Sequence, residues 1–367
     1  MILARDSVHW QSFLARSPLP SPLKRSIDSL IEQSILVTGA GGSIGSALAL
    51  RLAVHGARLI LLESSEMALH ELQQAFADRG AGDRAAFYLG SAGDGILLNE
   101  IFAVHRPHLV FHAAAFKHVP LLEEQPLAAI ANNVLATQVL VAAASVNDAH
   151  IVLLSTDKAV APAAVMGATK RAAEQIVLAN GSVVLRLGNV LASRGSVAEV
   201  FAEQIATGRS LTVTSPAARR YFITVDEAVD LLLAAAGDPV KPSLFVPNLH
   251  VSHYIVDLAR FMARTLAPHR EISLEFTHLR AGDKESEFLW SAAETPFAVG
   301  ANGLVRVNSP SLPTDRLERL LGNLQAAVEL REGSIALTIL CKLVPDYTPS
   351  NVVRTLRSRL ESPVHDA

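Results

Sequence analysis

The stretch that decides the fold is "ILVTGAGGSIGSALALRLAVHG", residues 35–56. It opens with the short apolar run ILVT (35–38) and passes, through three glycines, into a longer run whose apolar residues have helical spacing. Gly39, Gly42 and Gly45 form the pattern TGxxGxxG. Glycines at this spacing let the backbone turn tightly and approach a pyrophosphate at the N-terminus of the helix. Glycine turns are common, but the order strand, loop, helix favours a dinucleotide site over a purely structural turn.

The alternation of short strands and helices continues downstream. Further strands are predicted at 58–63, 85–90, 108–113, 150–155 and 182–187. Strands separated by helices pair in parallel and are covered on both faces, so we expect an α/β protein. The predicted fold is a Rossmann-type doubly wound parallel sheet with a smaller C-terminal substrate lobe and a helical tail. Ligands of such sheets bind at the carboxyl ends of the strands.

The choice of dinucleotide depends on Glu63, which ends the second predicted strand. An acid at this distance from the glycines hydrogen-bonds the adenosine ribose and repels a 2′-phosphate. Ser64 and Ser65 follow, with no arginine to receive such a phosphate, so we expect NAD rather than NADP. The alternative is that Glu63 only helps to cap the next helix. The residues assigned to the cofactor are Thr38, Gly39, Gly42, Ser43, Ile44, Gly45, Glu63, Ala113, Ala114 and Lys170.

Changes in the pattern of predicted strands and helices divide the chain into four parts. We predict an NAD-binding Rossmann domain over 34–190, to which some later segments return. Short strands and helices interrupted by Pro and Gly predict a substrate-binding lobe over 191–311, and 312–367 predict a tail of two or three helices. Residues 1–33 are rich in Pro and Ser and read as a packing segment with one weak helix, about 23–33.

Composition narrows the class of protein. The chain has 367 residues, half of them apolar, and a formal charge of −3, which does not suggest a general nucleic-acid binder. Cys341 is the one cysteine, so a disulfide framework is excluded and a reducing compartment fits. We see no signal peptide, and the longest apolar run, 134–146, looks too short and too polar to span a bilayer. We expect a cytoplasmic protein without a membrane span that forms a homo-oligomer.

A second polar cluster, "STDK" (155–158), follows a buried strand. Ser, Thr and Asp are frequent wherever a strand ends, so alone the cluster favours an ordinary loop. The glycine loop before it and Lys170 after it favour a catalytic site instead. Lys170 falls in the first turns of a predicted helix, where it can hydrogen-bond the nicotinamide ribose. Met166 stands four residues earlier, and its thioether can neither ionise nor pass a proton.

These stretches resemble the UDP-N-acetylglucosamine 4,6-dehydratases of bacterial polysaccharide biosynthesis, which are extended short-chain dehydrogenases/reductases. The matching stretches, in order over residues 35–290, are "VTGAGGSIGS", "HAAAFKHVPLLEEQP", "NNVLATQ", "LLSTDKAVAPAAVMGATKRAAE", "RLGNVLASRGSV", "RRYFITVDEAV" and "LRAGDKESE". That superfamily usually has tyrosine at the position of Met166, but this family commonly has methionine. The resemblance implies a lyase that converts UDP-N-acetylglucosamine into a UDP-4-keto-6-deoxy sugar, and Met166 points to retained configuration at C5.

The resemblance assigns the chemistry to Thr156, Asp157 and Lys158. Oxidation at C4 acidifies the C5 proton, which Lys158 would remove while Asp157 protonates the departing C6 hydroxyl. These roles require a neutral Lys158, favoured by burial and nearby Lys170, and a protonated Asp157. We expect the two adjacent side chains to point to different sides of their loop, and Thr156 to hydrogen-bond O4. The base for the C4 hydroxyl is left open between Asp157 acting twice and a bound water.

The resemblance also assigns a substrate side. Lys117 approaches the sugar, Asn133 braces the active-site backbone, and Asn189 with the loop at Ser193, Ser196 and Val197 holds the diphosphate and sugar. Arg220 and Arg280 are expected on the diphosphate, because guanidinium groups bind phosphate oxygens bidentately, and Asp283 on the uridine ribose. Each of these residues could instead be an ordinary surface or loop polar group.

Two other functions are weighed against dehydration. A nucleotide-sugar 4-epimerase needs hydride transfer alone and leaves the Asp157–Lys158 pair without a purpose. A non-catalytic NAD-binding regulator leaves the predicted substrate arginines without one. No metal is expected, because His105, His108, His112 and His118 share no strand or helix face and lack acidic or Cys partners at ligand spacing.

Overall fold

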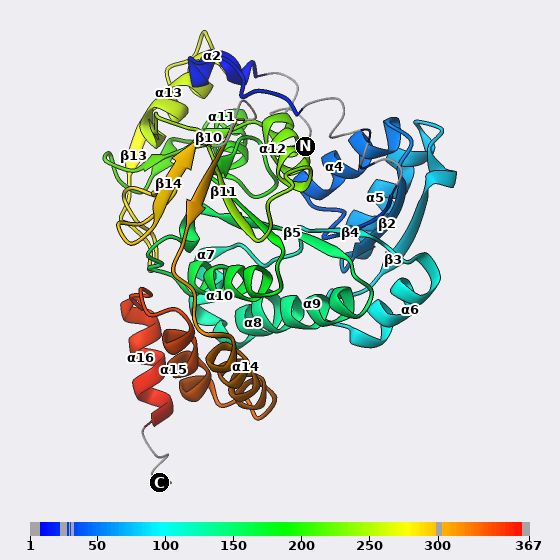
Figure 1. Ribbon diagram of the computed structural model, residues 1–367. Helices are drawn as coiled ribbons and strands as arrows, with labels where there is room; N and C mark the ends of the chain where they lie inside the picture. Colours follow the sequence, from blue (N-terminus) through cyan, green and yellow to red (C-terminus); the bar gives the residue numbers. More distant parts are fainter. Residues whose placement is uncertain (1–7, 23–27, 29, 31–32, 299–302, 362–367) are drawn as a thin grey trace.

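The computed structural model describes residues 8–22, 28, 30, 33–298 and 303–361. A nine-stranded sheet forms the centre of the molecule (Figure 1). Its strands, in spatial order, are β14 (Thr295–Ala298), β15 (Leu304–Asn308), β11 (Ser243–Pro247), β6 (Val183–Leu187), β5 (His150–Thr156), β4 (Leu109–His112), β1 (Ser34–Thr38), β2 (Arg58–Glu63) and β3 (Ala85–Leu89). All pairs from β11 to β3 are parallel, whereas β15 runs antiparallel to both of its neighbours.

Helices cover both faces of this sheet (Figure 1). One face carries α4 (Ser43–Val54), α5 (Glu66–Ala77) and α12 (Val225–Ala236), and the other carries α6 (Gly95–His105), α9 (Ala136–Val146) and α10 (Val165–Ala179). A short 3-10 turn, η1 (Gly82–Arg84), leads into β3. The predicted fold class is confirmed, and each of the predicted strands occurs within two residues of its expected bounds. These central strands are nearly continuous apolar runs because both of their faces are buried.

A smaller lobe lies beside the carboxyl ends of the strands and contains three two-stranded sheets. These pair β7 (Asn189–Val190) with β10 (Phe222–Ile223), β9 (Arg219–Arg220) with β12 (His253–Tyr254), and β8 (Leu211–Val213) with β13 (Leu274–Phe276). Helices α11 (Val197–Ala206) and α13 (Ile255–Leu266) enclose its core. The neighbouring segments β11, α12, β14 and β15 instead belong to the central sheet and its cover. The domain boundaries drawn from the sequence stay predictions.

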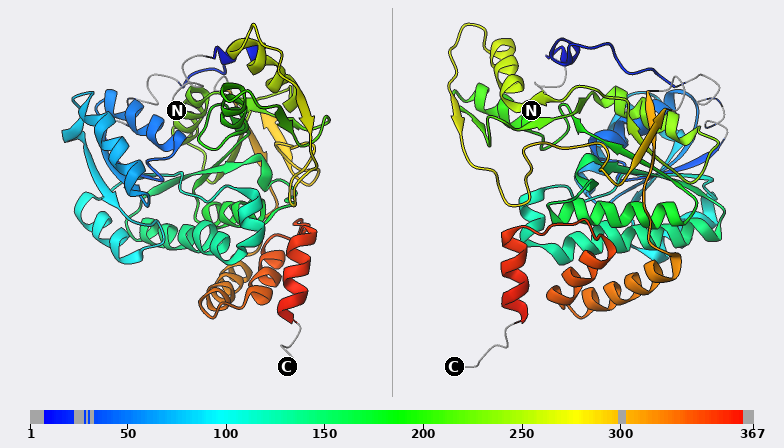
Figure 2. Two further views of the ribbon diagram at one scale, coloured as in Figure 1. Left: turned by 180° about the vertical axis from the view of Figure 1, so that it is seen from behind. Right: turned by 60° about the vertical axis from the view of Figure 1, so that its left-hand side comes forward.

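The described part of the N-terminal segment packs on this lobe. Helix α2 (Trp10–Leu14) lies beside α13 (Figure 2). It places Phe13 and Leu14 in the core of this lobe, where the Phe13 ring lies 5.4 Å from that of Phe261 on α13. Arg16 then forms an ion pair with Glu227 at the start of α12. The weak helix predicted at about 23–33 falls mostly outside the described residues.

The apolar run expected to be too short for a membrane span is longer in the structure. Helix α8 (Pro126–Ile130), the π-helical segment η2 (Ala131–Leu135) and α9 form one helical run, Pro126–Val146, which contains an 18-residue window of mean hydropathy 1.7. By length and composition this run could cross a bilayer, so the expectation about its length is wrong. However, 56% of its apolar window is buried inside the fold, which is typical of a core helix.

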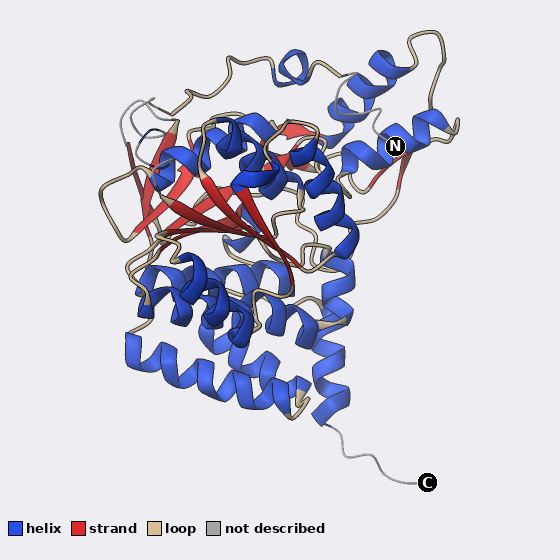
Figure 3. Cartoon of the chain, turned by 90° about the vertical axis from the view of Figure 1, so that its right-hand side faces the viewer, coloured by secondary structure: helices blue, strands red, loops and turns tan. Residues whose placement is uncertain are grey.

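The tail forms three helices in the described residues: α14 (Thr314–Glu329), α15 (Gly333–Leu343) and α16 (Asn351–Glu361). They pack against α7 (Val119–Glu124), α8, η2 and α10, and form a further layer outside the helices of that face (Figure 3). Their apolar side chains share one core with those of α10, including Leu324 and Leu340, which are fully buried. The tail therefore lies against the helix that carries Met166 and Lys170.

A buried ion cluster ties α10 to the sheet. The Arg186 guanidinium on β6 donates to the carboxylates of Glu174 on α10 and Glu294, with N–O distances of 2.8–2.9 Å. Arg171 also pairs with Glu174, and all four side chains are at least nine-tenths buried. Because of this pairing the pKa of Glu294 falls to about 2, against the unfavourable effect of its burial. The cluster therefore keeps both carboxylates ionised in a dry interior.

We predict that Arg186→Met destabilises the protein by about 3–5 kcal/mol, because two buried carboxylates lose their shared partner. Urea unfolding at pH 7 measures this change. Arg209→Met is the matched control, since Arg209 pairs with Glu203 at the surface and such pairs contribute about 1 kcal/mol or less. Equal effects of the two substitutions would contradict the stabilising role of the cluster.

Candidate active site

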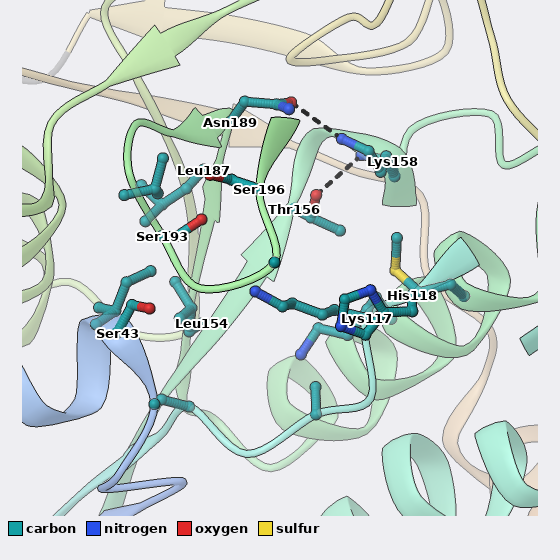
Figure 4. Close-up of a pocket in the computed structure, with 18 of the residues that line it drawn as sticks. Ser43, Lys117, His118, Leu154, Thr156, Lys158, Leu187, Asn189, Ser193 and Ser196 are labelled. Atoms are coloured by element: carbon teal, nitrogen blue, oxygen red, sulfur yellow. Dashed lines mark hydrogen bonds between the residues drawn. The ribbon is translucent and has the colours of Figure 1, made fainter. Parts of the chain in front are cut away.

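A cavity of about 580 Å³ opens at the carboxyl ends of β1, β4, β5 and β6 (Figure 4). This is the edge of the sheet where the sequence predicts a ligand, and the volume suits a small-molecule site. The glycine loop lies at one end of the cavity. The loop after β4, the end of β5, the start of α10 and the segment after β6 supply the other walls.

The glycine loop is built for close backbone approach. Gly39 has φ +67°, and a Cβ on Gly45 would lie 2.2 Å from the Gly39 carbonyl oxygen, so neither position accepts a larger residue. Gly42, Ser43 and Ile44 follow at the N-terminus of α4 and line the cavity together with Gly39 and Gly45. Helix N-termini leave backbone N–H groups without partners and attract anions. These residues fit the diphosphate of a dinucleotide.

Glu63 lies behind the glycine loop and is nearly buried. Its Oε2 accepts a hydrogen bond from the Gly41 N–H and its Oε1 accepts one from the Ser65 N–H, both at 2.9 Å. Glu63 thus links the glycine loop to the start of α5. This is close to the helix-capping role that the sequence analysis gave as the alternative to ribose binding. Its contact with a ribose stays a prediction.

His112 shows how the floor of the cavity is organised. Its ring nitrogens lie 2.7 Å from Thr38 Oγ1 and 3.0 Å from Thr137 Oγ1, inside the core. Burial, together with the charge of Lys170, lowers the pKa of His112 to about 3. This histidine is therefore a neutral link between β1, β4 and α9. Among the described residues, no group of three or more His, Cys, Asp or Glu side chains could hold a metal ion.

The predicted catalytic segment continues β5 into the 3-10 turn η3 (Asp157–Ala159). The Lys158 amino group lies in the cavity, 3.2 Å from the amide oxygen of Asn189 (Figure 4). It also lies 3.0 Å from Asp157 Oδ1. Thr156 Oγ1 donates to the same Asp157 oxygen at 2.9 Å. The expectation that Asp157 and Lys158 point to different sides of the loop is wrong, because the two form an ion pair. Asp157 is fully buried behind the other two, whereas Thr156 and Lys158 line the cavity.

Helix α10 also contributes Met166 and Lys170 to the cavity lining. Burial lowers the pKa of Lys170 to about 8, although the charge of Glu174 one turn later works in the other direction. Lys170 is therefore a cation that sits close to its titration point at neutral pH. Met166 is also buried, so the wall next to Lys170 offers a thioether and no proton donor at that position.

The predicted substrate residues fall into two groups. Lys117, Asn189, Ser193, Ser196 and Val197 line the cavity. Asn133 stands behind them: its amide accepts from the Phe116 N–H at 2.8 Å and donates to the Phe116 carbonyl at 3.0 Å, which fixes the backbone beside Lys117.

Arg220, Arg280 and Asp283 lie apart from the described residues that line the cavity. The Arg220 guanidinium donates to the carbonyls of Lys284 and Glu285 at 2.8 and 2.9 Å. Arg280 pairs with Asp283 at 2.9 Å. These arginines already have protein partners, and their contact with a diphosphate stays a prediction.

The loop after β6 bridges the two ends of the cavity. The Arg194 N–H donates to Ser43 Oγ at 2.9 Å, while Lys117 Nζ donates to the Arg194 carbonyl. A Cβ on Gly195 would lie 2.8 Å from the His118 ring, so loop and ring are in close contact. Burial lowers the pKa of Lys117.

Several lining residues were missed by the sequence analysis. They include Phe116, His118, Leu121, Leu122, Leu154 and Leu187. Their position next to predicted site residues in "HAAAFKHVP" and at the ends of strands could have indicated that they line the cavity. Apolar side chains, however, carry no chemical signature that separates a cavity wall from a core.

Comparison with known proteins identifies the family. The family model described as "Polysaccharide biosynthesis protein" matches residues 35–308, which is most of the chain. The chain belongs to this polysaccharide biosynthesis family. It is 37% identical over 295 residues to the probable polysaccharide biosynthesis protein EpsC of Bacillus subtilis, and 36% identical over 299 residues to the capsular polysaccharide biosynthesis protein CapD of Staphylococcus aureus. These matches cover 77% and 78% of this chain but 49% and 50% of the relatives, so the chain spans about half their length.

Other similarities include an epimerase and a dehydratase. A UDP-glucose 4-epimerase of Rickettsia rickettsii is 34% identical over 275 residues, 72% of this chain and 79% of its own. The solved structure of Pen from Bacillus thuringiensis superposes with a TM-score of 0.69 at 22% identity, covering 80% of this chain and 98% of that one. A dTDP-glucose 4,6-dehydratase of Streptomyces venezuelae, solved with NAD bound, gives 0.59 at 20% identity over 68% of this chain and 86% of its own. These structural matches show that this chain has the same Rossmann-like fold as the solved proteins.

We predict that Gly45→Ala weakens NAD binding at least about tenfold, because the new Cβ forces the glycine loop away from the position that a diphosphate requires. Calorimetric titration of NAD into protein with unchanged circular dichroism measures this. Gly322→Ala is the control, since Gly322 lies in α14 with open space around it. Unchanged affinity of Gly45→Ala would contradict the assignment of the loop.

We predict that Lys170→Met raises the free energy of unfolding at pH 7 by about 1–3 kcal/mol while it abolishes turnover. The folded pKa, about 8, lies below the ordinary value of 10.5, so the buried charge costs stability below pH 8 and the cost fades as the pH rises to 10.5. The gain should therefore disappear near pH 10.5 in urea unfolding experiments. Lys342→Met, at an exposed position of α15, is the control. Loss of stability at pH 7 would contradict the burial argument.

Proposed function

We propose that this chain is an NAD-dependent dehydratase of a UDP-sugar, with UDP-N-acetylglucosamine as the expected substrate and a UDP-4-keto-6-deoxy sugar as the product. The observation that carries the proposal is the Lys158 amino group, which Asp157 and Asn189 hold in the same cavity that Lys170 lines. A nearby base and acid are what elimination of water requires and what hydride transfer alone does not.

The cofactor side of the cavity supports NAD. The Cβ-free cradle of Gly39 and Gly45 leaves room for a diphosphate, and Ser43 with the N-terminus of α4 would hold it. Lys170 would hydrogen-bond the nicotinamide ribose, and the Glu63 carboxylate disfavours a 2′-phosphate. When bound, the nicotinamide would accept a hydride from C4 of the sugar and return it to C6.

The residues of the chain would move the protons. Thr156 would accept the C4 hydroxyl proton as it passes its own to Asp157 Oδ1, with which it is hydrogen-bonded. Asp157 would thus act twice, because the same proton later leaves with the C6 hydroxyl as water, through Thr156 or Lys158. Lys158 would remove the C5 proton, and the electrons of that C–H bond form the C5–C6 double bond.

Lys158 would finally return a proton to C5. Delivery by the same group from the same side explains retained configuration. Asn189 would keep the amine in place between the steps, because its amide oxygen lies 3.2 Å from Lys158 Nζ.

A second candidate is a nucleotide-sugar 4-epimerase, and the similarity to a protein named UDP-glucose 4-epimerase favours it. That reaction uses one hydride out and back at C4 and leaves C5 and C6 untouched. We rank it lower because the Asp157–Lys158 pair would then have no partner atom on the sugar. A non-catalytic regulator is a third candidate, which the open cavity beside Lys158 does not support.

Incubation with NAD and UDP-N-acetylglucosamine in heavy water distinguishes these functions. A retaining dehydratase should give a product that has lost one water and gained one deuterium at C5, as measured by mass spectrometry. An epimerase gives an isomer of unchanged mass, and a regulator gives no product. Either of these outcomes, repeated across UDP-hexoses and UDP-N-acetylhexosamines, would refute dehydration.

Lys158→Met tests the assigned base. We expect it to abolish product formation while NAD affinity stays within about threefold of wild type, because Lys158 faces the sugar side. Lys342→Met is again the control. A Lys158→Met protein that still releases water from the substrate would exclude this role.

A further inference from the structure

Residues 159–164, here called the linking loop, join the two catalytic segments. The loop begins directly after Lys158 and ends just before Val165, the first residue of α10, the helix that carries Met166 and Lys170. Within it Ala161 has φ +39°, in the left-handed region that residues with a Cβ rarely adopt. Such a conformation persists only where surrounding contacts determine it. The question is therefore what holds this loop.

Two contacts hold the loop on either side of Ala161. The Val160 carbonyl accepts a hydrogen bond from Lys284 Nζ at 3.0 Å. The Pro162 carbonyl accepts one from the Thr348 N–H at 2.9 Å. Both partners are distant in sequence: Lys284 follows the "RAGD" turn and Thr348 lies between α15 and α16 in the tail.

A third contact fixes the end of the loop through Glu123. This carboxylate is almost fully buried, and its Oε1 accepts from the Val165 N–H, the first of α10, at 2.7 Å. Its Oε2 accepts from the Ser350 hydroxyl, which stands just before α16. Glu123 thus joins the start of the catalytic helix to the tail. Gly282 closes this corner, because a Cβ there would lie 2.8 Å from the Ala164 Cβ.

We propose that Lys284, Thr348 and Ser350, the last through Glu123, form a clamp that sets the position of Lys158 relative to Lys170. Thr348 and Ser350 lie beyond residues 35–308, which match the family model, so the tail would add a positioning function to the shared fold. The clamp residues lie outside the cavity lining and act through the linking loop. Which chemical step depends on the clamp rests on the proposed function.

The apolar core of the tail does not account for these contacts. Helices α14–α16 already stabilise α10 through buried leucines such as Leu324 and Leu340. The clamp bonds instead end on backbone groups of the linking loop and at the first turn of α10. Bonds that served only to stabilise the tail would not need to end on a segment with a left-handed residue, Ala161, between the two lysines of the proposed site.

Ser350→Ala tests the clamp in the full-length protein loaded with NAD. We expect amide hydrogen exchange in residues 159–165 to rise at least about tenfold, since the loop opens locally while the rest of the fold stays closed. The matched control is Ser358→Ala, an exposed serine that bonds within α16. Ser350→Thr keeps a hydroxyl and should restore slow exchange. Thr348→Pro, which removes the N–H bound to Pro162, should reproduce the effect independently.

The catalytic consequence is measured on the same proteins. Ser350→Ala should lower kcat about tenfold to a hundredfold with KM unchanged, because a small displacement of a base is enough for that loss. Reduced nicotinamide should accumulate during turnover, since oxidation at C4 proceeds while removal of the C5 proton is slowed.

Two results would overturn the clamp: exchange in 159–165 that matches the Ser358→Ala control, or faster exchange with unchanged kcat. The exchange measurement needs no substrate, so it is independent of the proposed reaction. If wild type proves to be an epimerase, faster exchange with a lower epimerase kcat still supports the clamp, and only the assigned step fails.

Discussion

The Glu174 carboxylate is the constraint on which the active site depends. It accepts hydrogen bonds from Ser155 at the end of β5, from Arg186 on β6 and from Arg171 on its own helix, all at 2.6–3.0 Å. Three elements are thereby fixed at one buried point, one turn from Lys170 and one residue from Thr156. A buried charge that has strong partners in a fixed geometry tolerates little displacement, because each lost bond leaves an ion without solvation. These bonds therefore fix the position of β5 and β6 relative to α10.

Parallel strand pairing brings the other residues of the cavity together. The carboxyl ends of β1, β4, β5 and β6 meet at one edge, so the glycine loop, Lys117, Lys158 and Asn189 converge although they are far apart in sequence. The loop after β6 then spans this edge through Arg194, which contacts both Ser43 and Lys117. The backbone groups of Arg194 thus link Ser43, at the predicted cofactor end of the cavity, to Lys117, at the predicted sugar end.

Periodicity and glycine spacing predicted most of the fold, because each central strand is a short apolar run buried on both faces and bounded by turn residues. The same reasoning located Gly39 and Ser43 at the end of β1 and the start of α4, whereas Lys158 was assigned by the family resemblance and Lys170 by its place in a predicted helix. All four residues line the cavity. Sequence reasoning failed where three-dimensional contacts decide. The pairing of Asp157 with Lys158 depends on a 3-10 turn that local sequence does not specify, and the partners of Arg220 are carbonyls of a segment more than sixty residues away. Carbonyl groups have no sequence signature.

The replacement of tyrosine by Met166 becomes intelligible from this geometry. A phenol on α10 would pass protons from the helix side of the cavity, next to Lys170. Under the proposed function, the groups that would carry protons, Thr156, Asp157 and Lys158, all stand on β5 and its following turn, and Thr156 and Lys158 are each hydrogen-bonded to Asp157. That proposal places proton transfer on the strand, while Lys170 stays on the helix. Met166 is buried and its thioether offers no proton donor, so the proposed proton transfer relies on the groups at the end of β5.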